Sequence, residues 1–280
     1  MSTIITKADG TTEAFDLQKL LSSLRRAGAT EEAAQEIAIE TERRIKDHAS
    51  THDIYHHAFE LLRAHRSTAA ARYSLKRALL DFGPSGFPFE AYLAELFRKE
   101  GYEATIDQHI AGKCVTHEVD VVLHKGEERV YIEAKFHNSA GFKTDLQIAL
   151  YVQARIEDIQ ASQENGGAHA RGMLITNTKF TSLVLAYARC RGMELLGWEY
   201  PENNNLHDRI ERNRLYPITA LTSLSHEEKV NLLSQKVVLC HELSRQESAL
   251  SQAGVRSARM SGVLAEAGEL CDISTGPGMQ

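Results

Sequence analysis

The chain has 280 residues, a formal net charge of −6 and an apolar fraction of 42%, so it is expected to fold as two or three globular units rather than one. No apolar run approaches the ~20 residues of a membrane-spanning helix, and the N-terminus lacks the apolar core of a signal peptide. The four cysteines are scattered without C-x-x-C spacing, so neither a zinc ribbon nor a disulfide framework is indicated, and a cytoplasmic location is expected.

The first 85 residues are expected to form a short hairpin followed by helices. Asp9-Gly10 is a dipeptide typical of tight hairpin turns. The leucines between residues 17 and 24 recur at helical spacing, with Asp16 as the expected cap. Thr51 is expected to cap another helix, and a last helix is expected from about Ser67 to Asp81, before a Gly-Pro pair.

This order of elements resembles the ATP-cone, a nucleotide-binding regulatory module known from ribonucleotide reductases. The resemblance covers about residues 1–82. It is carried by Lys7, Asp9-Gly10, Glu13, Phe15-Asp16, Lys19 and Ala71-Arg72-Tyr73. It implies that Lys7 and Lys19 contact the phosphates of ATP or dATP as point charges. Ala8 stands where the family often has Arg, and a small helical dimerisation domain with solvated lysines is the alternative interpretation.

Charged residues interrupt an apolar strand in the middle segment, at Glu133-Ala134-Lys135 within VYIEAKF. Side chains alternate along a strand, so Glu133 and Lys135 lie on one face. Charges are costly to bury and are not needed for folding, so a divalent metal is the interpretation that we favour. A salt bridge on an exposed sheet face is the alternative.

The preceding strand supplies a partner for these charges. If Gly126-Glu127 is a two-residue hairpin loop, Asp120 lies opposite Glu133, and Glu118 lies opposite Lys135. Cβ atoms of such pairs are roughly 4.5–5.5 Å apart. Two carboxylates at that separation repel unless a cation lies between them or one holds a proton. Oxygen ligands of this kind suit Mg²⁺ or Mn²⁺.

Asp120, Glu133 and Lys135 match the PD-(D/E)-x-K nuclease pattern. The chain from about residue 87 to 198 resembles the Mrr-like restriction endonucleases, which implies an αβββαβ core. The resemblance implies that Asp120, Glu133 and the carbonyl of Ala134 bind Mg²⁺ or Mn²⁺, and that Lys135 orients or helps to deprotonate the attacking water. Glu90, at the edge of the apolar stripe of the opening helix, is a further catalytic candidate; a solvated helix edge is its alternative.

Residues after the hairpin supply candidates for DNA binding. A helix is expected from Lys143 to Gln160, and it carries Gln147 and Tyr151, a Q-x-x-x-Y spacing that resembles a DNA-contacting motif of related nucleases. Both project from one helix face. Thr176 and Asn177 follow a buried strand and are expected either to hold phosphate or to cap the next helix. Lys179 is expected to face a duplex.

The C-terminal part, residues 201–273, is expected to form a small helical module. Two short helices joined by a turn vaguely resemble a helix-hairpin-helix, and Ser225 and Glu228 have capping-box spacing. The Gly-x-Gly turn of that motif is missing, so a plain helical interaction element is the alternative. Residues 274–280 are expected to be a disordered tail.

We therefore expect an α/β protein with three parts: a mostly helical ATP-cone (1–85), a restriction-endonuclease-like domain (86–200) and the helical module (201–273). The expected function is a metal-dependent endodeoxyribonuclease of restriction or defence type, regulated by ATP or dATP and acting on double-stranded DNA. We expect a homo-oligomer without membrane contact. The alternatives are a nucleotide-sensing DNA-binding or assembly protein with a degenerate core, and a junction-resolving nuclease. No segment is basic overall, which favours selective over general DNA binding.

Overall fold

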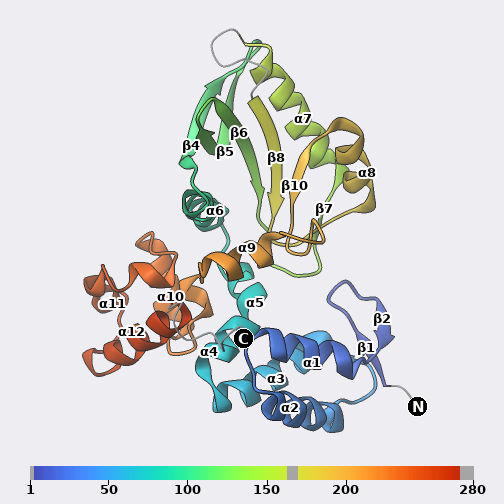
Figure 1. Ribbon diagram of the computed structural model, residues 1–280, viewed down its shortest axis with the longest axis vertical. Coiled ribbons are helices and arrows are strands. Elements are labelled where there is room, and N and C mark those ends of the chain that lie inside the picture. The colour runs from blue at the N-terminus through green and yellow to red at the C-terminus, as the bar shows by residue number, and fades with distance from the viewer. Residues whose placement is uncertain (1–2, 163–169, 272–280) are drawn as a thin grey trace, which may run out of the picture. The chain divides into compact units, whose positions relative to one another are not determined.

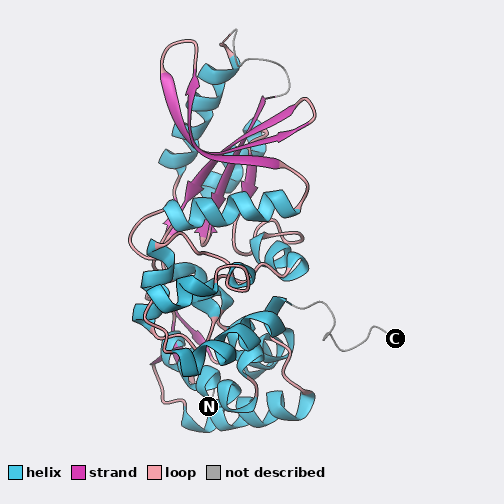
Figure 2. Ribbon diagram, turned by 90° about the vertical axis from the view of Figure 1, so that its left-hand side faces the viewer, coloured by secondary structure: helices cyan, strands magenta, loops and turns pink. Residues whose placement is uncertain are grey.

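The computed structural model describes residues 3–162 and 170–271 (Figure 1). The chain divides into two compact units. One unit joins the described residues up to Asp81 with those from Tyr216 onward, and the other spans Phe82–Leu215. The α/β fold class is confirmed: helices dominate the first unit, and the second contains a five-stranded sheet (Figure 2). Within the described ranges, no helix combines the length and apolarity that crossing a membrane requires.

The N-terminal part of the first unit is a three-stranded sheet beside a set of helices. The strand order is β2-β1-β3, with β1 antiparallel to β2 and parallel to β3. The expected turn at Asp9-Gly10 is present, and Asp16 caps α1 by accepting hydrogen bonds from the backbone of Gln18 and Lys19. The elements are β1 (Ile4–Thr6), β2 (Thr12–Ala14), α1 (Leu17–Arg26), α2 (Glu31–Arg44), β3 (Ala49–Ser50), α3 (Thr51–His65), α4 (Ser67–Tyr73) and α5 (Leu75–Leu80).

Two helix boundaries in this part differ from the expectation. Ser50, rather than Thr51, caps α3, since its hydroxyl accepts a 3.0 Å hydrogen bond from a backbone N–H of the first turn. The helix expected from Ser67 to Asp81 is divided into α4 and α5 at Ser74. The Ser74 hydroxyl donates a 2.9 Å hydrogen bond to the carbonyl of Ala71. Such local serine bonds offer the backbone an alternative to a continuous helix.

The C-terminal part of the first unit is more extensive than the two-helix module expected. The capping box of Ser225 and Glu228 is confirmed at the start of α10. Two further helices, α11 and α12, follow the pair that the sequence indicated. The elements are η1 (Ile218–Ala220), α10 (His226–Ser234), η2 (Cys240–Glu242), α11 (Glu247–Gln252) and α12 (Ser257–Cys271).

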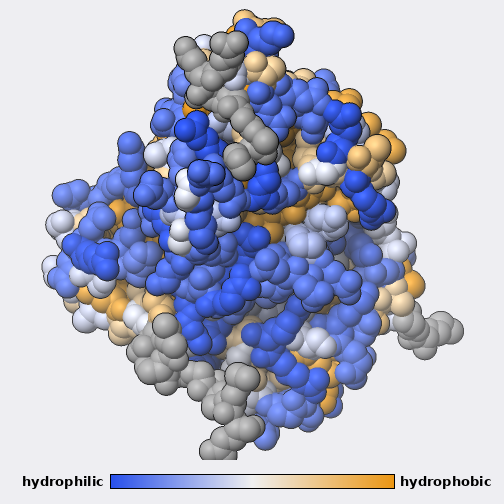
Figure 3. All heavy atoms as spheres, turned by 45° about the horizontal axis from the view of Figure 1, so that its top comes forward, coloured by the Kyte–Doolittle hydropathy of each residue, from blue (hydrophilic) through white to orange (hydrophobic). Residues whose placement is uncertain are grey.

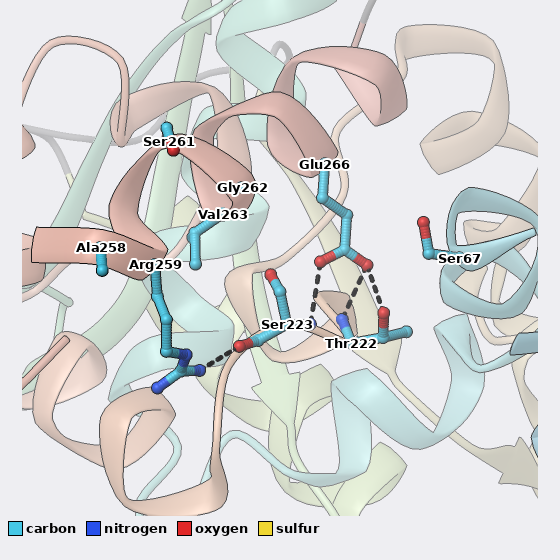
Figure 4. Close-up of a pocket in the computed structure, with 9 residues that line it drawn as sticks. All are labelled: Ser67, Thr222, Ser223, Ala258, Arg259, Ser261, Gly262, Val263 and Glu266. Atoms are coloured by element: carbon cyan, nitrogen blue, oxygen red, sulfur yellow. Dashed lines mark hydrogen bonds between the residues drawn. The ribbon is translucent and has the colours of Figure 1, made fainter. Parts of the chain in front are cut away.

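Two charged side chains of α12 fix it to the loop before α10. The carboxylate of Glu266 accepts hydrogen bonds from the backbone N–H groups of Thr222 (2.8 Å) and Ser223 (2.9 Å) and from the Thr222 hydroxyl (2.6 Å) (Figure 4). Arg259 lies 2.6 Å from Glu228 of the capping box. Glu266 and Arg259 border a cavity of about 400 Å³. Because protein partners satisfy both charged groups in its wall, we interpret these contacts as structural.

The second unit is built on a sheet of order β10-β8-β6-β5-β4. Neighbouring strands are antiparallel from β4 to β6 and parallel from β6 to β10. Helices α7 and α8 share one hydrophobic core with the sheet, and α6 packs on β4 and β5. The elements are α6 (Phe87–Lys99), β4 (Glu103–Ala111), β5 (Thr116–Lys125), β6 (Glu128–Lys135), β7 (Lys143–Thr144), α7 (Leu146–Gln160), β8 (Ala170–Thr176), β9 (Lys179–Phe180), α8 (Ser182–Arg191), β10 (Glu194–Leu196) and α9 (Leu206–Asn213).

The hairpin of β5 and β6 has the register that the sequence predicted. Paired residues run from Lys125 and Glu128 to Val121 and Ile132. The loop is therefore two residues long, and its first residue, Gly126, has a φ of 62°. That left-handed conformation is accessible to glycine without a steric penalty. A single loop glycine thus sets the alignment of the two strands that carry the candidate site.

The division of the chain at residue 201 differs from the two units observed. Residues 201–215 belong to the second unit, in which Arg209 of α9 lies 3.0 Å from Glu100 at the end of α6. The segment from residue 216 belongs to the first unit, in which the Thr219 hydroxyl donates a 2.7 Å hydrogen bond to the carbonyl of Ala78. The C-terminal helices therefore fold with the N-terminal part instead of forming a third body. The expected tail, residues 274–280, lies outside the described residues.

Candidate active site

The β5–β6 hairpin brings the expected acidic residues together. Asp120 lies on β5, while Glu133, Ala134 and Lys135 form the end of β6. Oδ2 of Asp120 accepts a 2.7 Å hydrogen bond from the backbone N–H of Ala134. Asp120 and Glu133 stand one step beyond the last ladder pair of the hairpin, on one face of the sheet. The side chain of Lys135 lies on that same face, because it is two residues further along β6.

Two carboxyl groups at this site have strongly raised pKa values. Burial raises the pKa of Asp120 to about 6, and the negative charge of Glu133 adds to the shift. Burial also raises the pKa of Glu90, in the first turn of α6, to about 7, with Asp120 as the strongest charged neighbour. Each shift arises chiefly from burial, and neighbouring carboxylates add to it. Perturbed carboxyl groups that influence one another are typical of functional sites.

The donor atoms present fit a hard divalent cation. Among the residues that the structure describes, no three His, Cys, Asp or Glu side chains converge on a metal-sized site. Glu90 therefore does not complete a set of three carboxylates, and the candidate donors are the carboxylates of Asp120 and Glu133 and the carbonyl of Ala134. Mg²⁺ commonly takes one or two protein carboxylates. A cation here would also offset the charge that raises the pKa of Asp120.

The Ala134 carbonyl remains a suitable donor for such a cation. It accepts a 3.1 Å hydrogen bond from the backbone N–H of Phe136. A carbonyl oxygen has two lone pairs, so this contact does not by itself prevent a further bond. The donor set of the site is thus made only of oxygen atoms, the ligands that Mg²⁺ and Mn²⁺ prefer.

Arg155 of α7 belongs to the site although the sequence did not reveal it. Its Nη1 lies 2.6 Å from Oε2 of Glu133, and its side chain is 9% exposed. Nη2 donates a 2.8 Å hydrogen bond to the hydroxyl of Tyr151, and the guanidinium lies 4.6 Å from the centre of the Tyr151 ring. The four-residue spacing of Tyr151 and Arg155 was a visible signal that they share a helix face. Nothing local in the sequence links Arg155 to a strand 22 residues earlier.

Gln147 and Tyr151 are both exposed on α7. Their spacing places them one helical turn apart on the same face, and Tyr151 is 55% exposed despite its bond to Arg155. The helix begins at Leu146, later than expected, because Asp145 caps it by accepting a hydrogen bond from its first turn. The two side chains are thus placed where a duplex can reach them.

Thr176 and Asn177 do not have the place expected of DNA-binding residues. Both side chains are fully buried. The Asn177 amide spans the loop after Lys135: its Oδ1 accepts a 2.9 Å hydrogen bond from the backbone N–H of His137, and its Nδ2 donates a 2.7 Å hydrogen bond to the His137 carbonyl. Thr181, not Thr176, caps α8. In the described structure Asn177 thus supports the loop that follows β6, and the Thr176 hydroxyl bonds to Thr178.

Two lysines lie side by side on the short β7–β9 ribbon. Lys143 of β7 and Lys179 of β9 are partners in its parallel register, and both are exposed. Lys179 also lies 3.0 Å from Glu199. The expected DNA-facing position of Lys179 is consistent with this exposure, and Lys143 is a neighbouring cation that the sequence had not singled out. Ion pairs between exposed side chains contribute little stability, so Lys179 can exchange Glu199 for a phosphate at small cost.

The candidate nucleotide-binding lysines form a cluster in the first unit. Glu13 of β2 lies 2.7 Å from Lys7 and 3.6 Å from Lys19. The hydrogen bond to Lys7 is the main cause that lowers the pKa of Glu13. The structure therefore brings together Lys7 and Lys19, as expected, around a carboxylate that balances part of their charge.

The molecular surface offers no large apolar face in the view of Figure 3, where hydrophilic residues predominate and apolar ones occupy smaller patches. Large apolar side chains that are exposed on the second unit are Val115, Phe142, Leu150, Tyr151 and Leu183. Phe142 stacks on His137 with a ring separation of 5.8 Å. Aromatic groups thus accompany the polar candidates near the end of β6.

Comparison with known proteins finds a sequence and a solved structure that share much of the chain. A protein from Archaeoglobus fulgidus, described as uncharacterized, is 34% identical over 176 residues, which is 62% of this chain and 97% of the relative. The crystal structure of AF1548, a protein of unknown function, matches with a TM-score of 0.55 and 31% identity, over 67% of this chain and 98% of that chain. Can2 from Sulfobacillus thermosulfidooxidans, solved with cyclic tetra-adenylate, matches at 16% identity over 44% of this chain and 34% of that chain, with a TM-score of only 0.32.

Three family models match successive parts of the chain. An ATP cone domain matches residues 3–81, a restriction endonuclease domain of the Mrr catalytic type matches residues 84–199, and an AF1548-like C-terminal domain matches residues 216–271. The first two confirm the resemblances that the sequence suggested. The third covers the part for which the sequence suggested a helix-hairpin-helix-like module, and that interpretation stays a prediction. The chain therefore belongs to the AF1548-like family, and it combines the C-terminal domain of that family with an ATP cone and an Mrr-type restriction endonuclease domain.

Proposed function

We propose that the protein is a metal-dependent endodeoxyribonuclease of restriction or defence type that hydrolyses double-stranded DNA under the control of ATP or dATP. The observation that carries this proposal is the placement of Asp120, Glu133 and Lys135 on one face at the end of a hairpin. That arrangement, inside a restriction endonuclease domain, places two carboxylates that can hold a cation beside a lysine, which supports hydrolysis of phosphodiester bonds. The raised pKa of the Asp120 carboxyl group, caused chiefly by its burial, is typical of functional sites and supports the same proposal.

Each residue has a defined task in this proposal. Asp120, Glu133 and the Ala134 carbonyl hold the cation. A divalent ion bound there supplies Lewis acidity at the phosphate and lowers the pKa of water. Lys135 orients the attacking water and stabilises the charge that develops on the phosphate oxygens. Glu90, whose pKa of about 7 lies near physiological pH, exchanges a proton with solvent at the edge of the site.

Residues outside the acidic cluster position the duplex. Gln147 and Tyr151 contact the DNA backbone from α7, and the neighbouring cations Lys143 and Lys179 neutralise phosphates from the β7–β9 ribbon. Because these cations are few and the domain is acidic overall, affinity depends on more than counterion release. Cleavage is therefore selective, which suits an enzyme of restriction or defence type.

The cleavage experiment uses the full chain with a panel of supercoiled, linear, modified and branched DNA. We expect cutting with Mg²⁺ or Mn²⁺, and none in EDTA. Asp120→Ala should abolish cutting while the circular dichroism spectrum and melting temperature show a folded protein. Failure of the wild-type protein to cut any DNA of the panel with either metal, with and without ATP, would overturn the nuclease proposal.

The nucleotide arm of the proposal is tested separately. ATP and dATP are titrated into the full chain by calorimetry, and cleavage is measured at saturating nucleotide. We expect binding, and a change in the cleavage rate that a Lys7→Ala, Lys19→Ala double variant abolishes. Absence of heat at millimolar nucleotide would remove nucleotide control without affecting the nuclease proposal.

A further inference from the structure

Arg155 forms an ion pair with Glu133, one of the two carboxylates of the candidate metal site. Its Nη1 lies 2.6 Å from Oε2 of Glu133, and the guanidinium remains charged at every physiological pH. An oxygen held at this distance by a cationic donor is not fully available to a metal ion. The wall of the site therefore contains a cation that competes with the metal for the same ligand.

The contact is built into the fold rather than a chance surface pair. The Arg155 and Glu133 side chains are 9% and 17% exposed. Next to Arg155, Ile156 packs so closely on β8 that a Cβ at Gly172 would lie 2.6 Å from its Cγ1. Asp158, one turn along, accepts a 2.9 Å hydrogen bond from the backbone of Cys114. Helix α7 is thus fixed to the sheet on both sides, and Arg155 is aimed at β6.

Arg155 also has unused hydrogen-bonding capacity. Its Nη2 binds the Tyr151 hydroxyl, whereas its Nε is buried and has no hydrogen-bond partner in the described structure. A buried donor without a partner is unfavourable. A phosphate oxygen presented at Tyr151 would offer the guanidinium a stronger, bidentate partner than a single carboxylate oxygen.

We propose that Arg155 gates metal loading, by holding Glu133 in the metal-free protein and releasing it when a DNA phosphate engages Arg155 and Tyr151. This inference rests on the proposed nuclease function and adds a positioning role for Arg155. Metal and DNA then bind cooperatively, because each favours the state in which Arg155 has left Glu133. The cation would therefore be retained chiefly on the DNA-bound enzyme.

The test measures Mn²⁺ affinity by calorimetry and by the electron paramagnetic resonance signal of free Mn²⁺, without DNA. We expect Arg155→Met to bind Mn²⁺ about tenfold more tightly than the wild type, since Glu133 loses its competing partner. Arg191→Met is the matched control. It removes an exposed guanidinium at the end of α8, which pairs with Glu157 on α7, the helix that carries Arg155. Asp120→Ala verifies that the ion measured is at this site.

Cooperativity is measured in a Lys135→Ala background, which keeps the duplex intact. A short duplex should tighten Mn²⁺ binding about tenfold when Arg155 is present, and should have no such effect in Arg155→Met. Tyr151→Phe, a milder change, should shift both measurements in the same direction and guards against a folding defect in Arg155→Met. Unchanged or weaker Mn²⁺ binding in folded Arg155→Met overturns the gate.

The two proposals fail in different ways. If the wild type cuts no DNA but Arg155→Met binds Mn²⁺ more tightly, the nuclease function is wrong and the competition between Arg155 and metal stands. If the wild type cuts DNA and the Mn²⁺ affinities are equal, the gate alone is wrong, and Arg155 only stabilises the fold. Cooperative binding of Mn²⁺ and DNA that persists in Arg155→Met also counts against the gate.

Discussion

Asp120 on β5 accepts a 2.7 Å hydrogen bond from the backbone N–H of Ala134 on β6. The bond holds the carboxylate against the strand that carries Glu133 and Lys135, so the hairpin register fixes all three side chains. Burial still raises the pKa of Asp120 to about 6, and Glu133 adds to the shift, even though the bond to Ala134 opposes it. The hydrogen bond therefore fixes the position of the Asp120 carboxyl group, while burial and the charge of Glu133 disfavour its ionised form.

The raised pKa of Asp120 predicts that the stability of the fold depends on pH. In the unfolded chain the pKa of Asp120 is about 4, below the value of about 6 in the folded protein. The stabilisation by its proton is therefore full below pH 4 and is lost as the pH rises through 6. Asp120→Asn removes the charge and should raise the free energy of unfolding of the metal-free protein by about 1–2 kcal/mol at pH 8.

Denaturant unfolding at pH 8 and at pH 4 measures this effect, which should shrink at the lower pH. Glu127→Gln is the control, because Glu127 is exposed in the hairpin loop and should change stability little at either pH. A destabilised Asp120→Asn at pH 8 would contradict the interpretation that burial and the charge of Glu133 disfavour the ionised form of Asp120.

Metal affinity should rise with pH, whereas the stabilisation by the proton of Asp120 falls. Binding requires an ionised Asp120 carboxylate, whose pKa is about 6, and an ionised Glu90 nearby, whose pKa is about 7, adds negative charge that favours the cation. The affinity for Mn²⁺ should therefore be nearly constant above pH 8 and should fall by about tenfold per pH unit below pH 6. Calorimetric titration between pH 5 and pH 8.5 measures the profile. A flat profile across this range would show that neither carboxyl group titrates with metal binding.

Lys135→Ala should separate catalysis from metal binding. The lysine acts on the water and on the charge of the phosphate, so its loss should reduce the cleavage rate by about 10³-fold or more. Mn²⁺ binding should be retained, because Asp120, Glu133 and the Ala134 carbonyl are unchanged. Single-turnover cleavage and calorimetry provide the two measurements. Loss of metal binding together with activity would mean that Lys135 positions the metal ligands and does not act on the water or the phosphate.

Asn177→Ala should act on stability, because the Asn177 amide holds the backbone of His137 from within the core. We expect the free energy of unfolding to fall by about 1–3 kcal/mol, as the buried N–H and carbonyl of His137 lose their partner. Thermal melts measure this loss. If Asn177→Ala keeps its stability and selectively loses DNA affinity, the correction drawn from its burial is wrong.

Lys179→Ala should act on DNA affinity instead. Its side chain is exposed and pairs with Glu199 at the surface, so stability should change by less than about 1 kcal/mol. DNA binding should weaken for every sequence alike, and the slope of log affinity against log salt should fall by about 1. Fluorescence anisotropy in Ca²⁺, at several salt concentrations, measures both. An unchanged salt dependence would place Lys179 outside the DNA interface.

Local sequence was sufficient for several parts of the fold. The turn at Gly126 and the alternation of the flanking strands predicted the hairpin register, because a two-residue loop leaves only one alignment of its strands. The caps at Asp16 and Ser225 were visible for the same reason, since a cap involves residues within one helical turn. The boundary errors are small: Ser50 and Thr51 are two hydroxyl residues that compete for one cap, and the hydroxyl of Ser74 bonds to the backbone of its own helix.

Residues of the site that depend on distant contacts could not be predicted. Thr176 and Asn177 looked like polar residues at the edge of a sheet, and only the path of the chain after Lys135 buries them under His137. Arg155 looked like one more helix cation until α7 returned across the sheet to Glu133.

The sequence by itself therefore determined the hairpin, the pairing of Asp120 with Glu133, and the family resemblances of the N-terminal and middle parts, because each is encoded within a few turns or strands. The tertiary structure alone decided which cations and amides surround that pair. It also decided that the segment from residue 216 folds with the N-terminal part. The physical reason is that burial and ion pairing depend on packing between elements far apart in the chain, and local patterns specify only which face each element presents.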